Sequence, residues 1–304
     1  MLRADSSALI ERTPESVFEF VALDFFRNYP RWSPEVVALT PLTPGPLRAG
    51  ALARQVRVDR GRRTEATFRL TELEPCRAVT FEGVSTPFVI AYRFEPAGSH
   101  TRVTFSFQLL RLEFYMRPFE RLIRAAARDG VAQTLRNLKA LVEREVAPAQ
   151  APPPLTVALA PSAEVPPVLR QMLDGCVNGA TLVDPAGPDQ PLVYVNPAFE
   201  RLSGYAQDEL LGRNCRLLHR EDRDQPGLAA VREAISALRP ATVLLRNYRR
   251  QGGMFWNRVS ILPLLDPDGG PRYFLGVQCD LSAEPRAPDE LEQLALRLRA
   301  LGTT

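Results

Sequence analysis

A proline-rich stretch near the middle of the chain constrains the fold more than any other feature. Residues 146–169 read VAPAQAPPPLTVALAPSAEVPPVL and contain seven prolines and one charged residue. Proline breaks helices and favours extended backbone, so we expect a semi-rigid linker here and not a membrane-spanning helix. In a chain of 304 residues the stretch leaves 145 residues before it and 135 after it, and each part has the usual size of one domain. The sequence therefore predicts two domains.

Charge and cysteine content exclude several classes of protein. The net charge is +3, from 38 Lys and Arg against 35 Asp and Glu, so no electrostatic footprint for nucleic acid or an anionic membrane is present. The four cysteines are far apart and form no CxxC pair, which argues against a disulfide framework or a zinc site. The first twenty residues lack the apolar run of a signal peptide. We expect a cytoplasmic protein with no metal, no nucleic-acid partner and no membrane insertion.

The first half of the chain predicts an antiparallel sheet followed by one long helix. A short helix is expected to begin at Thr13 or Pro14, and NYPRWSP (residues 28–34) indicates a turn. From about Glu113 to Glu145, apolar residues recur at steps of three and four, as in an amphipathic helix. Between these helices lie six strand-like runs at short spacings: EVVALT (35–40), ALARQVRV (51–58), RTEATFRLTEL (63–73), AVTFEGV (78–84), FVIAYRFE (88–95) and TRVTFSFQLL (101–110).

This element order, the PESVFEFV helix, the NYPRWSP segment and the long final helix resemble the START-like (SRPBCC, polyketide cyclase-like) superfamily over residues 1–146. The resemblance implies a helix-grip fold with an internal cavity for a small apolar ligand, and some members are cyclases or aromatases. Phe88, Tyr92, Phe114 and Phe119 fit a cavity wall or a filled core equally well. No acid–base pair stands out, so we expect ligand binding here, with a light-regulated cyclase-like enzyme as the alternative. The RVDRGRR cluster (57–63) indicates an exposed hairpin tip.

The second half predicts a five-stranded antiparallel sheet with short helices on one face, which is the order of a PAS domain. The expected strands are ATLVDP (180–185), PLVYVN (191–196), TVLLRNYRR (242–250), MFWNRVSILPLLD (254–266) and RYFLGVQCDLS (272–282). A three-residue loop at 251–253 would pair Asn247 with Asn257 on one face, and Gln278 adds a third carboxamide. Carboxamide groups on an otherwise apolar sheet face cost several kcal/mol if they have no hydrogen-bond partner. We therefore predict that a ligand binds there.

A flavin fits these demands. Its pyrimidine edge alternates donors and acceptors, as a carboxamide requires, and the guanidinium groups of Arg216 and Arg232 suit a terminal phosphate. FMN satisfies both conditions.

The segment GRNCRLLH (212–219) resembles the signature of light-oxygen-voltage (LOV) photoreceptor domains, and the match extends over about residues 178–283. The resemblance implies a blue-light photoreceptor in which Cys215 forms a reversible adduct with FMN. It also implies that Gln278 is the switch amide, whose rotation follows protonation of the flavin, and that Arg232, Asn247 and Asn257 bind the cofactor. The alternative is a flavin redox sensor in which the thiol is incidental.

Other residues near the signature carry open alternatives. Asn214 either bonds the ribityl chain or caps a helix. His219 replaces the glutamine that is usual in the family, so it either faces the flavin and changes the adduct lifetime or its pH dependence, or turns to solvent. The expected apolar walls around the ring, each of which also fits a plain core, are Leu228, Val259, Ile261 and Phe274.

The predicted fold class is α+β, with a helix-grip domain and a PAS/LOV domain. The predicted boundaries are 1–146 for the START-like domain, 147–167 for the linker, 168–285 for the PAS/LOV domain and 286–304 for a flanking helix. Leucines in the flanking helix indicate either docking on the sheet or pairing in a homodimer. We expect a homodimer, and a signal that passes to the START-like domain or to the dimer interface.

Overall fold

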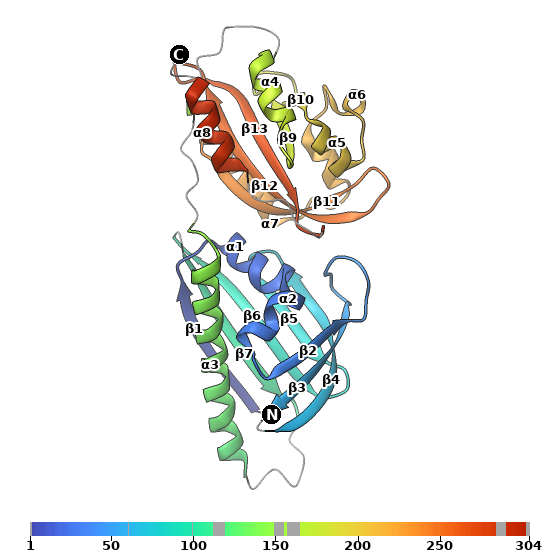
Figure 1. Ribbon diagram of the computed structural model, residues 1–304, viewed down its shortest axis with the longest axis vertical. Helices are drawn as coiled ribbons and strands as arrows, with labels where there is room; N and C mark the ends of the chain where they lie inside the picture. The colour runs from blue at the N-terminus through green and yellow to red at the C-terminus, as the bar shows by residue number, and fades with distance from the viewer. Residues whose placement is uncertain are drawn as a thin grey trace. The chain divides into compact units, whose positions relative to one another are not determined.

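The computed structural model describes residues 2–59, 61–98, 100–111, 119–148, 155–156, 165–283 and 290–301. These residues divide into two compact units, 1–149 and 150–304, coloured blue to green and yellow-green to red in Figure 1. Each unit combines helices with an antiparallel sheet, so the predicted α+β class is confirmed. We describe each unit by itself.

The first unit contains a seven-stranded antiparallel sheet in the order β1-β7-β6-β5-β4-β3-β2. The six predicted strands are present, and β1 is an additional strand that pairs with β7 along its whole length. The segment LRADSSALI gave little strand signal because polar residues, Asp5, Ser6 and Ser7, occupy its centre, yet Leu2 and Ala4 are buried. The strands are β1 (Leu2–Ile10), β2 (Val36–Pro41), β3 (Leu52–Asp59), β4 (Arg62–Glu74), β5 (Ala78–Gly83), β6 (Phe88–Ala97) and β7 (His100–Leu109).

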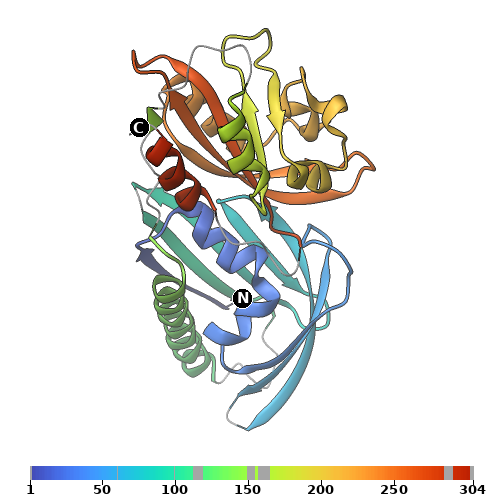
Figure 2. The ribbon, with the colours of Figure 1, turned by 45° about the horizontal axis from the view of Figure 1, so that its top comes forward.

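Helices lie over one face of this sheet (Figures 1 and 2). The early helix begins as predicted, with Thr13 accepting a hydrogen bond from the amide of Ser16. The turn predicted at NYPRWSP is wrong over residues 28–32, because α2 runs through Pro30. Stacking of Phe25 on Tyr29, with ring centroids 4.7 Å apart, and burial of Trp32 stabilise this turn of helix despite the missing proline donor. The helices are α1 (Pro14–Phe18), a π-helical turn (Glu19–Leu23), α2 (Phe25–Trp32) and α3 (Glu120–Glu145).

The expected start of the long helix, at about Glu113, lies outside the described residues. In the described residues α3 runs over Glu120–Glu145, and Phe114 lies among the residues 112–118 that are not described. Phe119 and Leu122 are exposed, so the apolar stripe is not buried at its amino-terminal end. The packed part of the helix carries Val131, Leu135, Leu138, Leu141 and Val142. The second half of α3 therefore anchors it, and its first half borders a cavity described below.

The second unit contains five antiparallel strands in the order β10-β9-β13-β12-β11, as predicted. A short strand inside the predicted linker, β8 (Leu155–Thr156), pairs in parallel with β12. The strands are β9 (Gly179–Val183), β10 (Leu192–Val195), β11 (Ala241–Tyr248), β12 (Met254–Leu265) and β13 (Pro271–Asp280). The helices are α4 (Pro167–Asp174), α5 (Pro197–Ser203), α6 (Gln207–Leu210), a 3₁₀ helix (Cys215–His219), α7 (Pro226–Ser236) and α8 (Leu291–Leu301).

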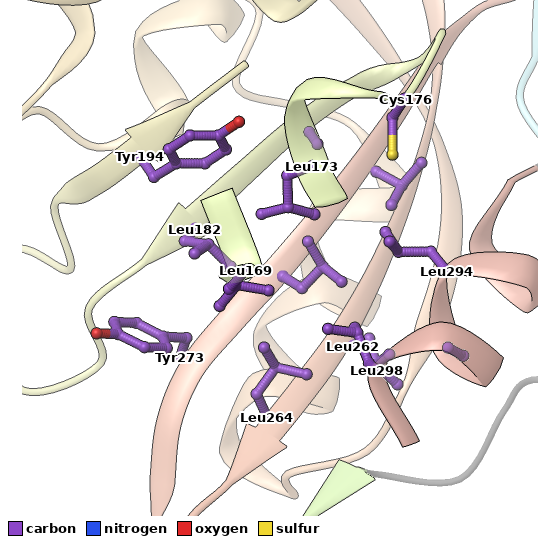
Figure 3. Packing of buried hydrophobic residues seen from close by; sticks show 14 of the residues in the cluster. Leu169, Leu173, Cys176, Leu182, Tyr194, Leu262, Leu264, Tyr273, Leu294 and Leu298 are labelled. Atoms are coloured by element: carbon purple, nitrogen blue, oxygen red, sulfur yellow. The ribbon is translucent and has the colours of Figure 1, made fainter. Parts of the chain in front are cut away.

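One face of this sheet forms an apolar core with α4 and α8. Figure 3 shows Leu169 and Leu173 of α4 and Leu294 and Leu298 of α8 gathered over Leu262 of β12. Of the two arrangements left open for the leucines of the flanking helix, the structure therefore has docking on the sheet. Because side chains alternate along a strand, the opposite face is free to form a site.

We predict that Leu294→Ala lowers the free energy of unfolding of the second unit by about 2–5 kcal/mol, since it removes a core side chain and leaves a cavity. Leu296→Ala, on the same helix, is the matched control and should change it by less than about 0.5 kcal/mol, because Leu294 is 2% and Leu296 63% exposed. The measurement is urea unfolding followed by Trp256 fluorescence, with Trp32→Phe in both variants and in the reference protein. Equal effects of the two substitutions would contradict the docking of α8.

Candidate functional site

A cavity of about 330 Å³ lies in the second unit, between the sheet and the helices of residues 215–235. Its size is within the range of small-molecule sites. All twelve residues singled out from the sequence line it: Asn214, Cys215, Arg216, His219, Leu228, Arg232, Asn247, Asn257, Val259, Ile261, Phe274 and Gln278. Segments that are far apart in the sequence thus supply one pocket.

Strand alternation explains which sheet residues reach the cavity. On β12, Val259 and Ile261 line it, whereas Leu262 belongs to the core under α4 and α8. On β13, Gln278 lines the cavity and Val277 lies in that core. Side chains on one face of the sheet therefore line the cavity, and those on the other face form the apolar core.

The predicted register of the β11–β12 hairpin is wrong, because the loop lies one residue earlier in the chain than predicted. The loop is Arg250–Gly252, closed by a hydrogen bond of 2.9 Å from the Arg249 amide to the Gly253 carbonyl. Gly252 has φ +96°, which glycine adopts readily. Asn247 consequently lies opposite Phe255, and Asn257 lies opposite Leu245. The two asparagines are diagonal neighbours, not a direct pair, and remain on one face.

The two asparagine side chains form a short chain of hydrogen bonds that leaves one oxygen unmatched. Asn257 donates from Nδ2 to Oδ1 of Asn247 at 2.8 Å, and Asn247 donates from Nδ2 to the carbonyl of Arg246 at 3.0 Å. Asn257 is fully buried, yet its Oδ1 has no hydrogen-bond partner among the described residues. A buried acceptor left unpaired costs about 1–3 kcal/mol. A ligand with a hydrogen-bond donor at this point would satisfy the Asn257 oxygen and remove this cost.

Gln278 and Cys215 meet at a residue that the sequence analysis missed. Gln278 donates from Nε2 to Oγ1 of Thr181 at 3.1 Å, and the Thr181 side chain also interacts with the Cys215 thiol. A Cβ at Gly276 would lie 2.6 Å from Oγ1 of Thr181 and 3.1 Å from Nε2 of Gln278. Glycine at 276 therefore leaves the room in which these side chains meet.

Cys215 is held as a neutral thiol. Burial raises the pKa of Cys215 to about 12, and hydrogen bonding with Thr181 acts in the opposite, weaker sense. A thiol with this pKa is almost entirely protonated at neutral pH and is a poor nucleophile. Any bond that this sulfur forms in the cavity needs activation by the ligand.

Asn214 caps the short helix that carries Cys215. Its Oδ1 accepts a hydrogen bond from the Arg216 amide at 2.9 Å, and its Nδ2 donates to the carbonyl of Asp189 at 2.6 Å. Asn214 therefore caps the helix, which is one of the two roles left open for it, and it also lines the cavity.

Basic side chains contribute to the cavity wall. Arg216 is exposed and pairs with Asp189 at 2.6 Å. Arg232 is exposed and has no ion-pair partner in the part of the chain that the structure describes. Arg223, which the sequence analysis missed, also lines the cavity. Three guanidinium groups in the wall make the cavity suitable for a ligand with an anionic group.

His219 lines the cavity and is partly buried. Burial lowers the pKa of His219, Arg216 and Arg223 lower it further, and only Asp222 acts in the opposite sense. His219 is therefore a neutral imidazole at pH 7, with one donor and one acceptor nitrogen.

A polar network ties the segment after His219 to β11. Arg246 donates from Nε and Nη2 to the two carboxylate oxygens of Asp222 at 2.7 and 2.8 Å, and Tyr248 donates to Asp222 at 3.0 Å. Gln225 donates to the carbonyl of Arg246 and accepts from its amide. These bonds fix the entry to α7, which carries Leu228 and Arg232.

Nine lining residues were not predicted: Thr181, Val183, Gln190, Leu218, Arg223, Val231, Ile235, Leu245 and Gly276. Strand alternation alone would have identified Leu245 and Gly276, because Leu245 lies two residues from Asn247 and Gly276 lies two residues from both Phe274 and Gln278. Gln190 and Arg223 carry no such signal, since they lie in loops.

The first unit contains a second, larger cavity of about 720 Å³ between α3 and the sheet. Phe88 lines it, whereas Tyr92 is fully buried in the core and Phe119 is exposed. The four aromatic residues considered together from the sequence therefore have different environments, and Phe114 lies outside the described residues.

Metal clusters and membrane-spanning helices are both absent from the described residues. No group of three or more His, Cys, Asp or Glu side chains in these ranges is arranged to hold a metal ion. None of the helices in the same ranges has the length and apolar character needed to cross a membrane.

Comparisons with known proteins support the same division. Residues 1–143 match the family of polyketide cyclases, dehydrases and lipid transport proteins, and residues 177–283 match the PAS domain family. A blue-light photoreceptor of Listeria monocytogenes is 39% identical over 125 residues, which cover 41% of this chain and 49% of that protein. The blue-light-activated histidine kinase 1 of Erythrobacter litoralis is 44% identical over 119 residues, which cover 38% of this chain and 33% of that protein.

A solved structure of a LOV protein from Rhodobacter sphaeroides is 29% identical, with a TM-score of 0.38, over 44% of this chain and 89% of the other. The chain spans less than half the length of the two curated relatives named above. The predicted family resemblances are confirmed by the matches. The chain combines a polyketide cyclase-like (START-like) domain with a PAS domain of the kind found in LOV blue-light photoreceptors.

Proposed function

We propose that the second unit is a blue-light sensor that binds FMN in the cavity of about 330 Å³. The single observation that carries the proposal is the unmatched Oδ1 of the buried Asn257. A flavin presents an N–H group between two carbonyl groups along one edge, which is the pattern that a donor-seeking amide oxygen and its carboxamide neighbours require. The names of two relatives, a blue-light photoreceptor and a blue-light-activated histidine kinase, support the light-sensing part of the proposal.

The residues of the cavity divide into three groups that suit the parts of FMN. Asn247, Asn257 and Gln278 would hold the polar edge of the ring. Arg216 and Arg232, with Arg223, would hold the phosphate, and His219 adds a donor for a ribityl or phosphate oxygen. The ring would lie among apolar side chains, which are Leu228, Val259, Ile261 and Phe274.

Cys215 has the properties of a thiol that reacts only after light absorption. When bound, the flavin supplies a ring whose excited state reacts with a neutral thiol. We propose that the Cys215 sulfur forms a reversible bond to a ring carbon while the thiol proton moves to the adjacent ring nitrogen. The raised pKa of Cys215 keeps the sulfur protonated in the dark and makes a dark reaction slow. In the dark, the bond breaks and the proton returns.

Gln278 lies where it could transmit a change in flavin protonation from the cavity to the apolar core. Its amide bonds Thr181 within the cavity, and the adjacent Val277 packs in the core under α4 and α8. If the flavin nitrogen beside Gln278 changes from acceptor to donor, the amide must rotate or lose a bond worth about 1–3 kcal/mol. We propose that this shift in β13 alters the docking of α8, and that the signal reaches the START-like domain or a homodimer interface.

A second proposal concerns the first unit. Its cavity of about 720 Å³ supports the binding of a small, largely apolar ligand. The cyclase-like alternative stays a hypothesis, since the wall contains Tyr29, Glu35 and Arg57 besides hydrocarbon.

The direct test of the proposed function is the absorption spectrum of purified protein before and after blue light. We expect bound flavin whose blue absorption bleaches and recovers in the dark. Cys215→Ala should bind flavin and lose the bleaching, and Cys76→Ala, in the first unit, should retain it. A flavin-loaded Cys215→Ala protein that still bleaches reversibly would contradict the role of this thiol. Full signalling by that variant under chemical reduction would favour the redox-sensor alternative.

Asn257→Leu should weaken FMN binding by roughly tenfold or more, since it removes the buried acceptor that a ring donor would satisfy. Ser260→Ala is the control on the same strand, because Ser260 bonds Thr242 and does not line the cavity. The measurement is the dissociation constant of FMN from fluorescence quenching. Unchanged affinity in Asn257→Leu would contradict the proposed orientation of the ring.

His219→Gln should make the apoprotein less sensitive to acid. Because burial lowers the folded-state pKa of His219 below its usual value of about 6.5, the unfolded state binds more protons as the pH falls below that value. Acid then destabilises the fold, and this contribution is present at neutral pH and lost on acidification. The melting temperature should fall less between about pH 7 and pH 5 in His219→Gln than in the original protein. Parallel pH profiles for the two proteins would exclude the buried, neutral imidazole.

A further inference from the structure

The cavity of the first unit owes its space to small residues on α3. Ala126, Ala127 and Gly130 face it from the helix, and Phe105 and Phe107 face it from β7. Small side chains on one wall and aromatic rings on the other leave a volume of about 720 Å³, which is in the range that holds a small organic molecule. Most of this wall is apolar, so shape and hydrophobic burial alone would not select among ligands.

One polar atom in the wall is unmatched. Gln55 lies on β3 opposite Ala66, lines the cavity and is 4% exposed. Its Oε1 is buried and has no hydrogen-bond partner among the described residues. As at Asn257, a buried acceptor in this state costs about as much as a lost hydrogen bond. A ligand hydroxyl would satisfy it.

The charged groups near Gln55 are already balanced. The guanidinium of Arg57 lies 3.7 Å from the Glu35 carboxylate and 3.5 Å from that of Asp59, and donates to the Tyr29 hydroxyl at 3.4 Å. Burial raises the pKa of Tyr29, so it stays a neutral phenol. Arg62 and Glu65 add one charge of each sign to the wall. With carboxylates in the majority, this part of the wall does not favour an anionic ligand. Arg57, expected from the sequence on an exposed hairpin tip, thus belongs to the cavity.

We propose that the first unit selects a neutral, largely apolar ligand that carries a hydroxyl group, and that Gln55 is the residue that recognises the hydroxyl. This inference rests on the proposed ligand-binding role of the first unit. It adds a rule of selection: an ether or a carboxylate with the same ring system should bind less tightly, because the ether offers no donor to Oε1 and the carboxylate adds a charge next to Glu35 and Asp59. A site built to accept a hydroxyl donor discriminates strongly against analogues that lack it.

The test uses three probes with one ring system: phenanthrol, its methyl ether and phenanthrene carboxylate. Their dissociation constants are measured by titration calorimetry with the full-length, FMN-saturated protein, so that the cavity of the second unit is filled. We expect phenanthrol to bind about tenfold or more tightly than the ether and the carboxylate. Gln55→Leu should reduce the preference over the ether to less than about threefold, mainly by weakening phenanthrol binding.

Gln108→Leu, on β7 of the same unit, is the matched control, because Gln108 does not line the cavity, and it should keep the full preference. Equal binding of phenanthrol and its ether would overturn the selection rule while leaving ligand binding intact. Tighter binding of the carboxylate would overturn the neutral-ligand part of it. Retention of the preference in Gln55→Leu would overturn the role of Gln55. Failure of all three probes to bind would contradict the ligand-binding role as well.

Discussion

A buried amide oxygen without a donor, in a sheet whose other face is a packed apolar core, is the feature on which the account of the second unit depends. Asn257 is fixed by its bond to Asn247, and its strand, β12, packs on the opposite face against α4 and α8. Asn257 is fully buried, so its side chain cannot reach water without a movement of β12. The site is therefore preorganised for a donor-bearing ring, and the energetic cost of the empty acceptor favours binding.

The two units use one physical device for different ligands. Each has a cavity between a sheet and helices, and each cavity wall contains a carboxamide oxygen with no partner among the described residues, Oδ1 of Asn257 and Oε1 of Gln55. Their surroundings differ. The cavity of the second unit has three guanidinium groups at its wall, as a phosphate requires, whereas Arg57 in the first unit is neutralised by two carboxylates. Local charge balance separates an anionic cofactor from a neutral ligand.

Much of this could be predicted from the sequence, because strand alternation and fixed spacings are local properties. The five strands of the second unit follow from them, and the twelve predicted lining residues follow from them together with the resemblance to LOV domains. The features that the sequence analysis did not predict depend on tertiary context. The hairpin register required knowing which of two glycines takes the positive φ, and β1 is recognisable only through its pairing with β7. Thr181 looks like any strand threonine until folding places it between Gln278 and Cys215.

The central claim is that the Cys215 thiol reacts with a flavin held by these amides. Infrared difference spectroscopy of the flavin-loaded protein, before and after blue light, observes the thiol directly. The account predicts the loss of one S–H stretching band on illumination, its return in the dark, and no such change in Cys215→Ala. Bound flavin that responds to light while every S–H band persists would contradict it.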